Sequence, residues 1–173
     1  NFIPLGARHE RARGLCARPS ASPSISLFKR NSWVARMSFV RVHEVGPRDG
    51  LQNEPGVISV ERKVALVRAL VAAGLSRIEV GSFVSPKWVP QMADTDEVMA
   101  ALADVPGVRY DVLVPNMRGW DGFAATPRQG EYGVAVFIAA SEGFSRANLN
   151  CSIAASVARL VPVVEAAEAV GVP

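Results

Sequence analysis

The chain has 173 residues, of which 49% are hydrophobic and 20% are charged, and its formal net charge is +3. This is the composition of an ordinary soluble protein, and the length suggests one domain. No window reaches the roughly 18 uncharged apolar residues that a membrane span needs, so the sequence predicts no membrane association.

The net charge is unevenly distributed along the chain. Residues 1–36 carry seven basic side chains and one acid, whereas residues 37–173 carry the other 12 basic and 15 acidic side chains. The second segment is therefore mildly acidic, and it shows no basic stripe with interleaved aromatic residues. We accordingly expect no nucleic-acid partner.

The basic segment 1–36 lacks hydrophobic periodicity and is rich in Arg, Ser, Pro and Ala. Two interpretations remain open: upstream sequence translated ahead of Met37, or a mitochondrial transit peptide. Both predict a disordered leader. The first is typical of a bacterial cytoplasmic protein, and the second would place the protein in the mitochondrial matrix. Cys16 and Cys151 form neither a metal-ligand spacing nor a disulfide framework, which favours a reducing compartment.

The ordered pattern begins with an alternating strand at 39–45, which a Gly-Pro pair ends. A helix is predicted after Ser59, which can cap it, and before Gly74, which can close it. A second strand follows at 77–80 and a second helix at 93–103.

The second half of the chain repeats this alternation. It predicts a strand at 110–115, a short helix at 120–125, and the most apolar strand at 133–140. The last element is a long helix at 152–170, with a bend at Pro162.

Strands that alternate with helices imply an α/β fold with parallel strands and right-handed crossovers. The continuous apolar strand at 133–140 is typical of a sheet buried on both faces. The spacing of the strands fits a TIM barrel, which needs eight βα units and about 250 residues. Residues 37–173 supply about four units, so we expect a partial TIM barrel, its N-terminal half. A complete four-strand doubly wound domain is the alternative.

The segment from Glu44 to Glu54, Glu-Val-Gly-Pro-Arg-Asp-Gly-Leu-Gln-Asn-Glu, follows the first predicted strand. In α/β barrels the active site lies at this end of the strands. Pro47 and Gly50 hold Arg48 and Asp49 in a tight turn. The carboxylate suits a divalent cation with oxygen ligands, and the guanidinium suits a carboxylate or enolate oxygen. A solvated turn without function is the alternative for an isolated Arg-Asp pair.

The whole eleven-residue string resembles the signature of the 3-hydroxy-3-methylglutaryl-CoA lyase family. Three further segments resemble the same family: Ser-Phe-Val-Ser-Pro-Lys-Trp-Val-Pro-Gln-Met at 82–92, Val-Pro-Asn at 114–116 and Asn-Leu-Asn-Cys-Ser-Ile at 148–153. The resemblance runs from about 40 to 170. Related condensing enzymes and carboxyltransferases carry an Arg-Asp-Gly in a different setting.

The resemblance implies a metal-dependent carbon–carbon lyase with a barrel of the pyruvate-carboxyltransferase type. It would cleave 3-hydroxy-3-methylglutaryl-CoA to acetyl-CoA and acetoacetate, in leucine catabolism and ketone-body formation. In that family the residue matching Asp49 binds Mg²⁺ or Mn²⁺. The residue matching Arg48 contacts the acyl oxygen and stabilises the enolate, so we expect Arg48 to be both catalytic and substrate-binding.

Three further residues are candidates. Glu79 is expected to orient the metal site or Arg48 as a catalytic acid, against a salt bridge on the helix side. Gln52 is expected to support Arg48 or the substrate. Ser82 is expected to bind substrate, against a hydroxyl that only caps the loop. His43 and Cys151 are interpreted as structural.

The family's remaining metal ligands, a His-x-His pair and an Asn, are not found in this sequence, and Pro55 stands where many relatives carry a basic residue. We therefore expect the chain alone to have little lyase activity. A non-catalytic half barrel and a related acyl-CoA condensing enzyme or carboxyltransferase are the alternative functions. Open sheet edges at the first and last strands favour self-association, including a homodimer.

Overall fold

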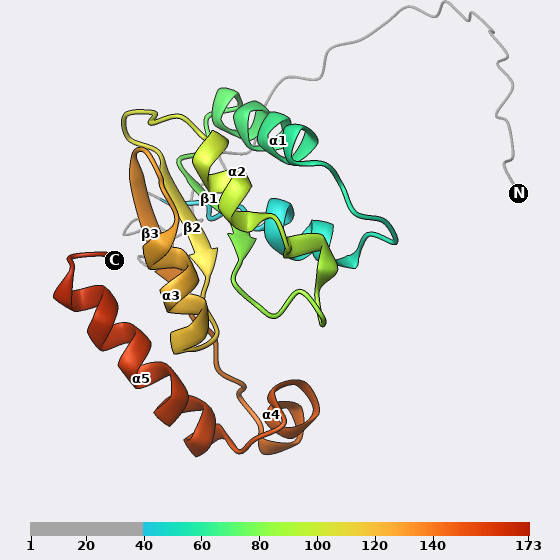
Figure 1. Ribbon diagram of the computed structural model, residues 1–173, viewed down its shortest axis with the longest axis vertical. Coiled ribbons are helices and arrows are strands. Elements are labelled where there is room, and N and C mark those ends of the chain that lie inside the picture. Colours follow the sequence, from blue (N-terminus) through green and yellow to red (C-terminus); the bar gives the residue numbers. More distant parts are fainter. Residues whose placement is uncertain (1–39) are drawn as a thin grey trace, which may run out of the picture. The chain divides into compact units, whose positions relative to one another are not determined.

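The computed structural model describes residues 40–173 (Figure 1). The predicted leader at 1–36, the predicted start of the body at Met37, and Cys16 lie outside the described residues. In the described part, no single helix is long and apolar enough to cross a membrane. Two successive helices, Glu142–Leu149 and Ile153–Ala169, pass that test only together, across a bend of 60°.

A parallel three-stranded sheet organises the described residues. Its strands are β1 (Arg77–Ser82), β2 (Arg109–Leu113) and β3 (Glu131–Ala135), and they lie in the order β1-β2-β3. The helices between successive strands supply the crossovers that parallel pairing requires. The predicted parallel α/β architecture is confirmed.

The first predicted strand, at 39–45, is the main difference in the sheet. Within residues 40–173 this segment makes one parallel bridge, between Glu44 and Ile78. Glu44 N donates to Arg77 O at 2.9 Å, and Glu79 N donates to Glu44 O at 2.8 Å. Val40 and Val42 are 66% and 57% exposed. The segment pairs with β1 only and buries little apolar surface. Its alternation of apolar and polar residues is therefore not enough to make it a full strand of the sheet.

The register of the sheet contains one irregularity that matters for the site. Glu79 pairs with Asp111, but Gly81 pairs with Val112 and Ser82 with Leu113, so β1 carries an extra residue between Glu79 and Gly81. Side chains alternate between faces along a regular strand. The bulge therefore brings Ser82 to the face of Glu79, although the two residues are three positions apart.

The helices are α1 (Val60–Ala72), α2 (Thr95–Ala101), α3 (Met117–Ala125), α4 (Glu142–Leu149) and α5 (Ile153–Ala169). As predicted, α1 begins after Ser59 and ends before Gly74, whose positive φ of 93° suits a glycine. The Ser59 side chain makes no capping hydrogen bond. Instead, its bond to the Glu61 carboxylate is the largest cause that lowers the pKa of Glu61.

Helix α5 runs as one element through Pro162, and Ser152 Oγ caps it by accepting from Ala155 N at 3.2 Å. The sequence did not predict α4, a short helix capped by Ser141. The predicted helix at 120–125 starts earlier, at Met117, because Asn116 Oδ1 accepts from Gly119 N.

The hydrophobic core lies between the sheet and the helices. Ile78, Tyr110 and Tyr132 are paired across the three strands on this face, with the two tyrosine rings 5.4 Å apart. Val67 of α1 and Phe123 of α3 are fully buried against them. The opposite face of the sheet presents charged side chains in the same register: Arg77, Glu79, Arg109, Asp111 and Glu131.

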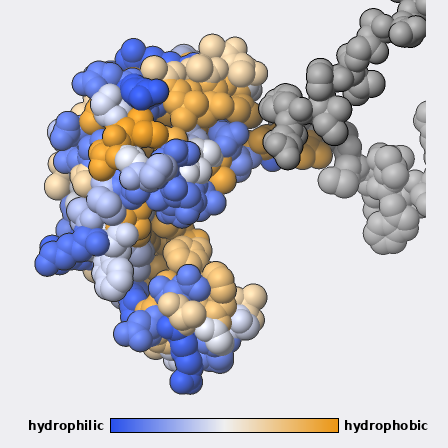
Figure 2. All heavy atoms as spheres, turned by 90° about the vertical axis from the view of Figure 1, so that its right-hand side faces the viewer, coloured by the Kyte–Doolittle hydropathy of each residue, from blue (hydrophilic) through white to orange (hydrophobic). Residues whose placement is uncertain are grey.

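The predicted strand at 133–140 is shorter than expected, and the prediction of a buried strand over its whole length is wrong. β3 ends at Ala135, and Val136, Phe137 and Ile138 are 39–54% exposed. With Val157 and Val161 of α5 these side chains line an apolar groove. Figure 2 likewise shows hydrophobic residues at the surface in the lower part, around α4. Strand pairing beyond Ala135 has no partner among the described residues, so the apolar run leaves the sheet.

Candidate active site

The turn after the first segment is a short π-helix, Gly46–Gly50, that places Arg48 and Asp49 side by side. Val45 O accepts from Arg48 N at 3.1 Å and from Asp49 N at 2.7 Å. Pro47 is buried and fixes the start of the turn. The backbone therefore directs both side chains from one rigid position at the carboxyl end of the segment that pairs with β1.

Arg48 lies between two carboxylates. Its Nε donates to Glu79 Oε1, and its Nη1 donates to Asp49 Oδ1 at 2.7 Å. The Arg48 and Glu79 side chains are 17% and 5% exposed, whereas that of Asp49 is 53% exposed. A buried acid thus fixes the guanidinium on one side, and its other edge faces an accessible carboxylate.

Gln52 belongs to the same cluster, because its Nε2 donates to Asp49 Oδ1 at 3.0 Å. Asn53 Nδ2 donates to the Asp49 carbonyl at 2.7 Å. The structure therefore brings four predicted site residues together: Arg48, Asp49, Gln52 and Glu79. Gln52 supports Asp49 directly and reaches Arg48 only through it. Glu79 therefore does not form the alternative salt bridge on the helix side of the sheet.

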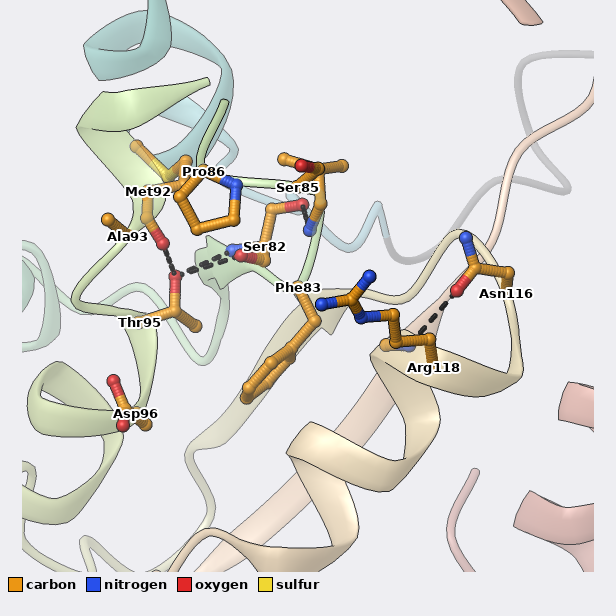
Figure 3. A pocket seen from close by; sticks show the side chains of 12 residues that line it. Ser82, Phe83, Ser85, Pro86, Met92, Ala93, Thr95, Asp96, Asn116 and Arg118 are labelled. Atoms are coloured by element: carbon orange, nitrogen blue, oxygen red, sulfur yellow. Dashed lines mark hydrogen bonds between the residues drawn. The ribbon is translucent and has the colours of Figure 1, made fainter. Parts of the chain in front are cut away.

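Ser82 stands apart from this cluster. Its hydroxyl donates to Leu113 O at 3.4 Å and accepts from Val84 N at 3.2 Å, which is the arrangement of a loop cap. The residue is 2% exposed, yet it lines a cavity at the end of β1 (Figure 3). Its substrate-binding role stays a prediction.

Asp111, a buried acid on the same sheet face as Glu79, was not predicted from the sequence. Its Oδ2 lies 3.3 Å from His43 Nε2, and its Oδ1 lies 2.9 Å from Arg109 Nε. A Cβ at Gly133 would lie 2.1 Å from Asp111 Oδ1, so a glycine is needed beside the carboxylate. The sequence feature that could have identified Asp111 is a charged residue between two apolar residues of a predicted strand.

No group of three or more His, Cys, Asp or Glu side chains within residues 40–173 could hold a metal ion. Asp49 offers one oxygen, Oδ2, that makes no hydrogen bond to another described residue. One accessible carboxylate oxygen fits a single ligand position of a hard divalent cation, which takes about six or more oxygen ligands. The described residues thus fit part of such a site.

The profile of the HMGL-like family matches residues 39–172. The chain is 59% identical over 128 residues to the 3-hydroxy-3-isohexenylglutaryl-CoA/hydroxy-methylglutaryl-CoA lyase of Pseudomonas aeruginosa, covering 74% of this chain and 42% of that protein. It is 55% identical over 131 residues to the hydroxymethylglutaryl-CoA lyase of Pseudomonas mevalonii, covering 76% and 42%. The chain thus spans less than half the length of these relatives.

Solved structures give the same result. The hydroxymethylglutaryl-CoA lyase of Pseudomonas aeruginosa superposes with a TM-score of 0.69 at 56% identity, over 75% of this chain and 42% of that one. A lyase from Acinetobacter baumannii, solved with coenzyme A and 3-methylmalate, superposes with a TM-score of 0.62 at 34% identity, over 75% and 41%. The matched structures are TIM barrels, so the predicted partial barrel is confirmed.

Proposed function

Because the chain belongs to the HMGL-like family over residues 39–172, we propose that it is part of a hydroxymethylglutaryl-CoA lyase. This enzyme would split 3-hydroxy-3-methylglutaryl-CoA into acetyl-CoA and acetoacetate. The observation that carries the proposal is the position of Arg48, a largely buried guanidinium held by Glu79 beside an accessible carboxylate.

The proposed reaction breaks a carbon–carbon bond and leaves negative charge on the thioester oxygen of the departing acetyl-CoA enolate. Arg48 uses Nε and one Nη1 proton within the protein, so further N–H groups remain to donate to that oxygen. Because Glu79 fixes the guanidinium beforehand, little reorganisation is needed when the charge develops. Glu79 is a positioning residue in this proposal, since it acts through Arg48.

We propose that Asp49 supplies one ligand to a divalent ion, Mg²⁺ or Mn²⁺. Such an ion, when bound, would polarise the substrate's hydroxyl and carboxylate oxygens. Asp49 Oδ1 is occupied by Arg48 and Gln52, which directs the carboxylate and leaves Oδ2 for the ligand position. Gln52 is therefore proposed to orient Asp49, with any substrate contact secondary to this.

An acyl-CoA is the proposed ligand class, and the coenzyme A in the Acinetobacter baumannii lyase structure supports it. Relatives carry both cytoplasmic and mitochondrial names. We propose a bacterial cytoplasmic protein, with residues 1–36 as a separate leader segment; a mitochondrial location would follow if that segment were a transit peptide. Self-association through the sheet edges likewise stays a proposal.

A chimera tests the function. Residues 40–172 would replace the matching segment of the Pseudomonas aeruginosa lyase, and formation of acetoacetate from 3-hydroxy-3-methylglutaryl-CoA would be measured with Mg²⁺. We expect cleavage by the chimera and a loss of about 10²–10³-fold in kcat with Arg48→Gln, since one donor to the developing charge disappears. Arg62→Gln, an exposed arginine of α1, is the matched control. A folded but inactive chimera, or full activity with Arg48→Gln, would contradict the proposal.

A further inference from the structure

Lys63 of α1 is a buried charge that takes no direct part in the proposed chemistry. The residue is 3% exposed, and it lies with Val64 and Val67 on the buried face of the helix. A lysine is rarely buried to this degree unless its charge is paired, because an ammonium group loses its hydration when it leaves water. Its partners therefore show which part of the structure the charge holds in place.

Both partners of the Lys63 ammonium group lie in the segment between β1 and α2. Nζ donates to Gln91 O and to Asp94 Oδ1, each at 2.5 Å, and the Asp94 side chain is 18% exposed. Asp94 immediately precedes α2, whose first residue, Thr95, is hydrogen-bonded to Ser82 at the end of β1 (Figure 3). Lys63 thus ties this segment to α1 at a point that β1 also fixes.

Gln91 connects the same segment to the turn that precedes α1. Its backbone oxygen accepts from Lys63, whereas its side-chain Nε2 donates to Glu54 O at 2.8 Å. Glu54 directly follows the short 3₁₀ helix Leu51–Asn53. Because the two bonds use different groups of Gln91, a side-chain substitution can remove one and keep the other.

Two residues of this 3₁₀ helix complete the connection to the site. Gln52 Nε2 donates to Asp49 Oδ1 at 3.0 Å, and Asn53 Nδ2 donates to Asp49 O at 2.7 Å. A series of contacts therefore runs from the Lys63 ammonium group, through Gln91 and the 3₁₀ helix, to both the backbone and the carboxylate of Asp49.

We propose that Lys63 is a positioning residue for the turn that carries Arg48 and Asp49. It fixes Gln91, and Gln91 fixes the end of the turn from which Asp49 is held. Residues that orient a metal ligand commonly matter for metal affinity nearly as much as the ligand does. This effect on the ion rests on the proposed function, whereas the effect on the order of the turn does not.

Native-state hydrogen exchange of the isotopically labelled full chain tests the connection. The amides of Arg48 and Asp49, which both donate to Val45 O, report on the turn. Lys63→Met removes the charge and keeps the length of the side chain, and Gln91→Met removes only the side-chain donor. We expect each variant to accelerate exchange of the two amides by about tenfold, because the turn opens more often.

Two comparisons separate positioning from a general loss of stability. Val114 is fully buried and its amide donates to Ala135 O at 2.9 Å, so its exchange should stay unchanged in Gln91→Met. Arg68→Met removes another basic side chain of α1 that donates to a carbonyl, Ala101 O at 3.3 Å, and should leave the turn unchanged. Unchanged exchange of the Asp49 amide in Gln91→Met, or equal acceleration there and at Val114, would overturn the proposal.

The double variant shows whether Lys63 acts through Gln91. It should exchange no faster at Asp49 than Lys63→Met alone, because both changes interrupt one series of contacts, and additive effects would overturn the proposal. If Lys63→Met does not fold, Asp94→Asn weakens the hold on the ammonium group less severely. It should still accelerate Asp49 more than Val114, and equal acceleration would overturn the proposal.

The chimera with the Pseudomonas aeruginosa lyase measures the catalytic consequence. Lys63→Met should raise the Mg²⁺ concentration for half-maximal acetoacetate formation by about tenfold and largely keep kcat at saturating Mg²⁺. An unchanged Mg²⁺ requirement would overturn the positioning role. If the unsubstituted chimera forms no acetoacetate while the exchange rates of the full chain respond as expected, the proposed function fails and the connection from Lys63 to the turn is supported.

Discussion

Substitution of Glu79 by glutamine should destabilise the fold, because it removes the buried charge opposite Arg48. The Glu79 side chain is 5% exposed. Breaking a fully buried ion pair costs roughly 3–5 kcal/mol. Arg48 retains Asp49 at 2.7 Å and is itself 17% exposed, and the glutamine oxygen can still accept from Nε. We therefore expect a loss of about 2 kcal/mol in the free energy of unfolding.

Urea unfolding followed by circular dichroism measures this loss. With a slope of about 1–3 kcal/mol per molar urea, the midpoint should fall by roughly 1 M. Glu97→Gln, on the exposed surface of α2, is the matched control and should change the midpoint little. In a double-mutant cycle with Arg48→Gln, the coupling energy should be about 1–2 kcal/mol. Equal midpoints for the two glutamine variants, or a coupling energy near zero, would refute the ion-pair argument.

Three further outcomes are expected. Burial raises the pKa of both Tyr110 and Tyr132 above their ordinary value of 10.0. The stability that the two neutral phenols contribute is therefore complete below pH 10 and is lost as the pH rises above that value. The melting temperature should fall above pH 10, and it should fall by a smaller amount in Tyr132→Phe. Gly133→Ala should cost about 1–3 kcal/mol in urea unfolding, because its Cβ would displace Asp111, whereas Gly143→Ala, which meets nothing within 4 Å, should be neutral or stabilising. The purified chain with Mg²⁺ should form little acetoacetate, since Asp49 is one ligand among the several such an ion needs; a rate comparable to that of the Pseudomonas aeruginosa lyase would contradict this.

The sequence predicted the alternation of strands and helices because each signal was local. Ser59 and Gly74 delimit α1 by their backbone preferences, and such preferences act within a turn of helix. The strand at 39–45 and the end of β3 were predicted less well. Whether a strand extends depends on a partner beside it, and alternation in one segment carries no information about that partner.

The site was predictable to a similar degree. Consecutive residues form the turn that carries Arg48 and Asp49, so this turn could be predicted locally. The family resemblance identified Glu79, which lies 31 positions from Arg48. The pairing of His43 with Asp111 joins the segment before the turn to β2 and depends on the space that Gly133 leaves.

The extra residue in β1 has a consequence for anyone who inserts or deletes residues there. Removing Val80 would give the strand uninterrupted pairing with β2 and would leave Ser82 opposite Leu113, on the face of Glu79. Inserting one regularly paired residue after Gly81 would instead move Ser82 to the opposite face of the sheet. The number of residues between Glu79 and Ser82 therefore decides whether the two side chains share a face.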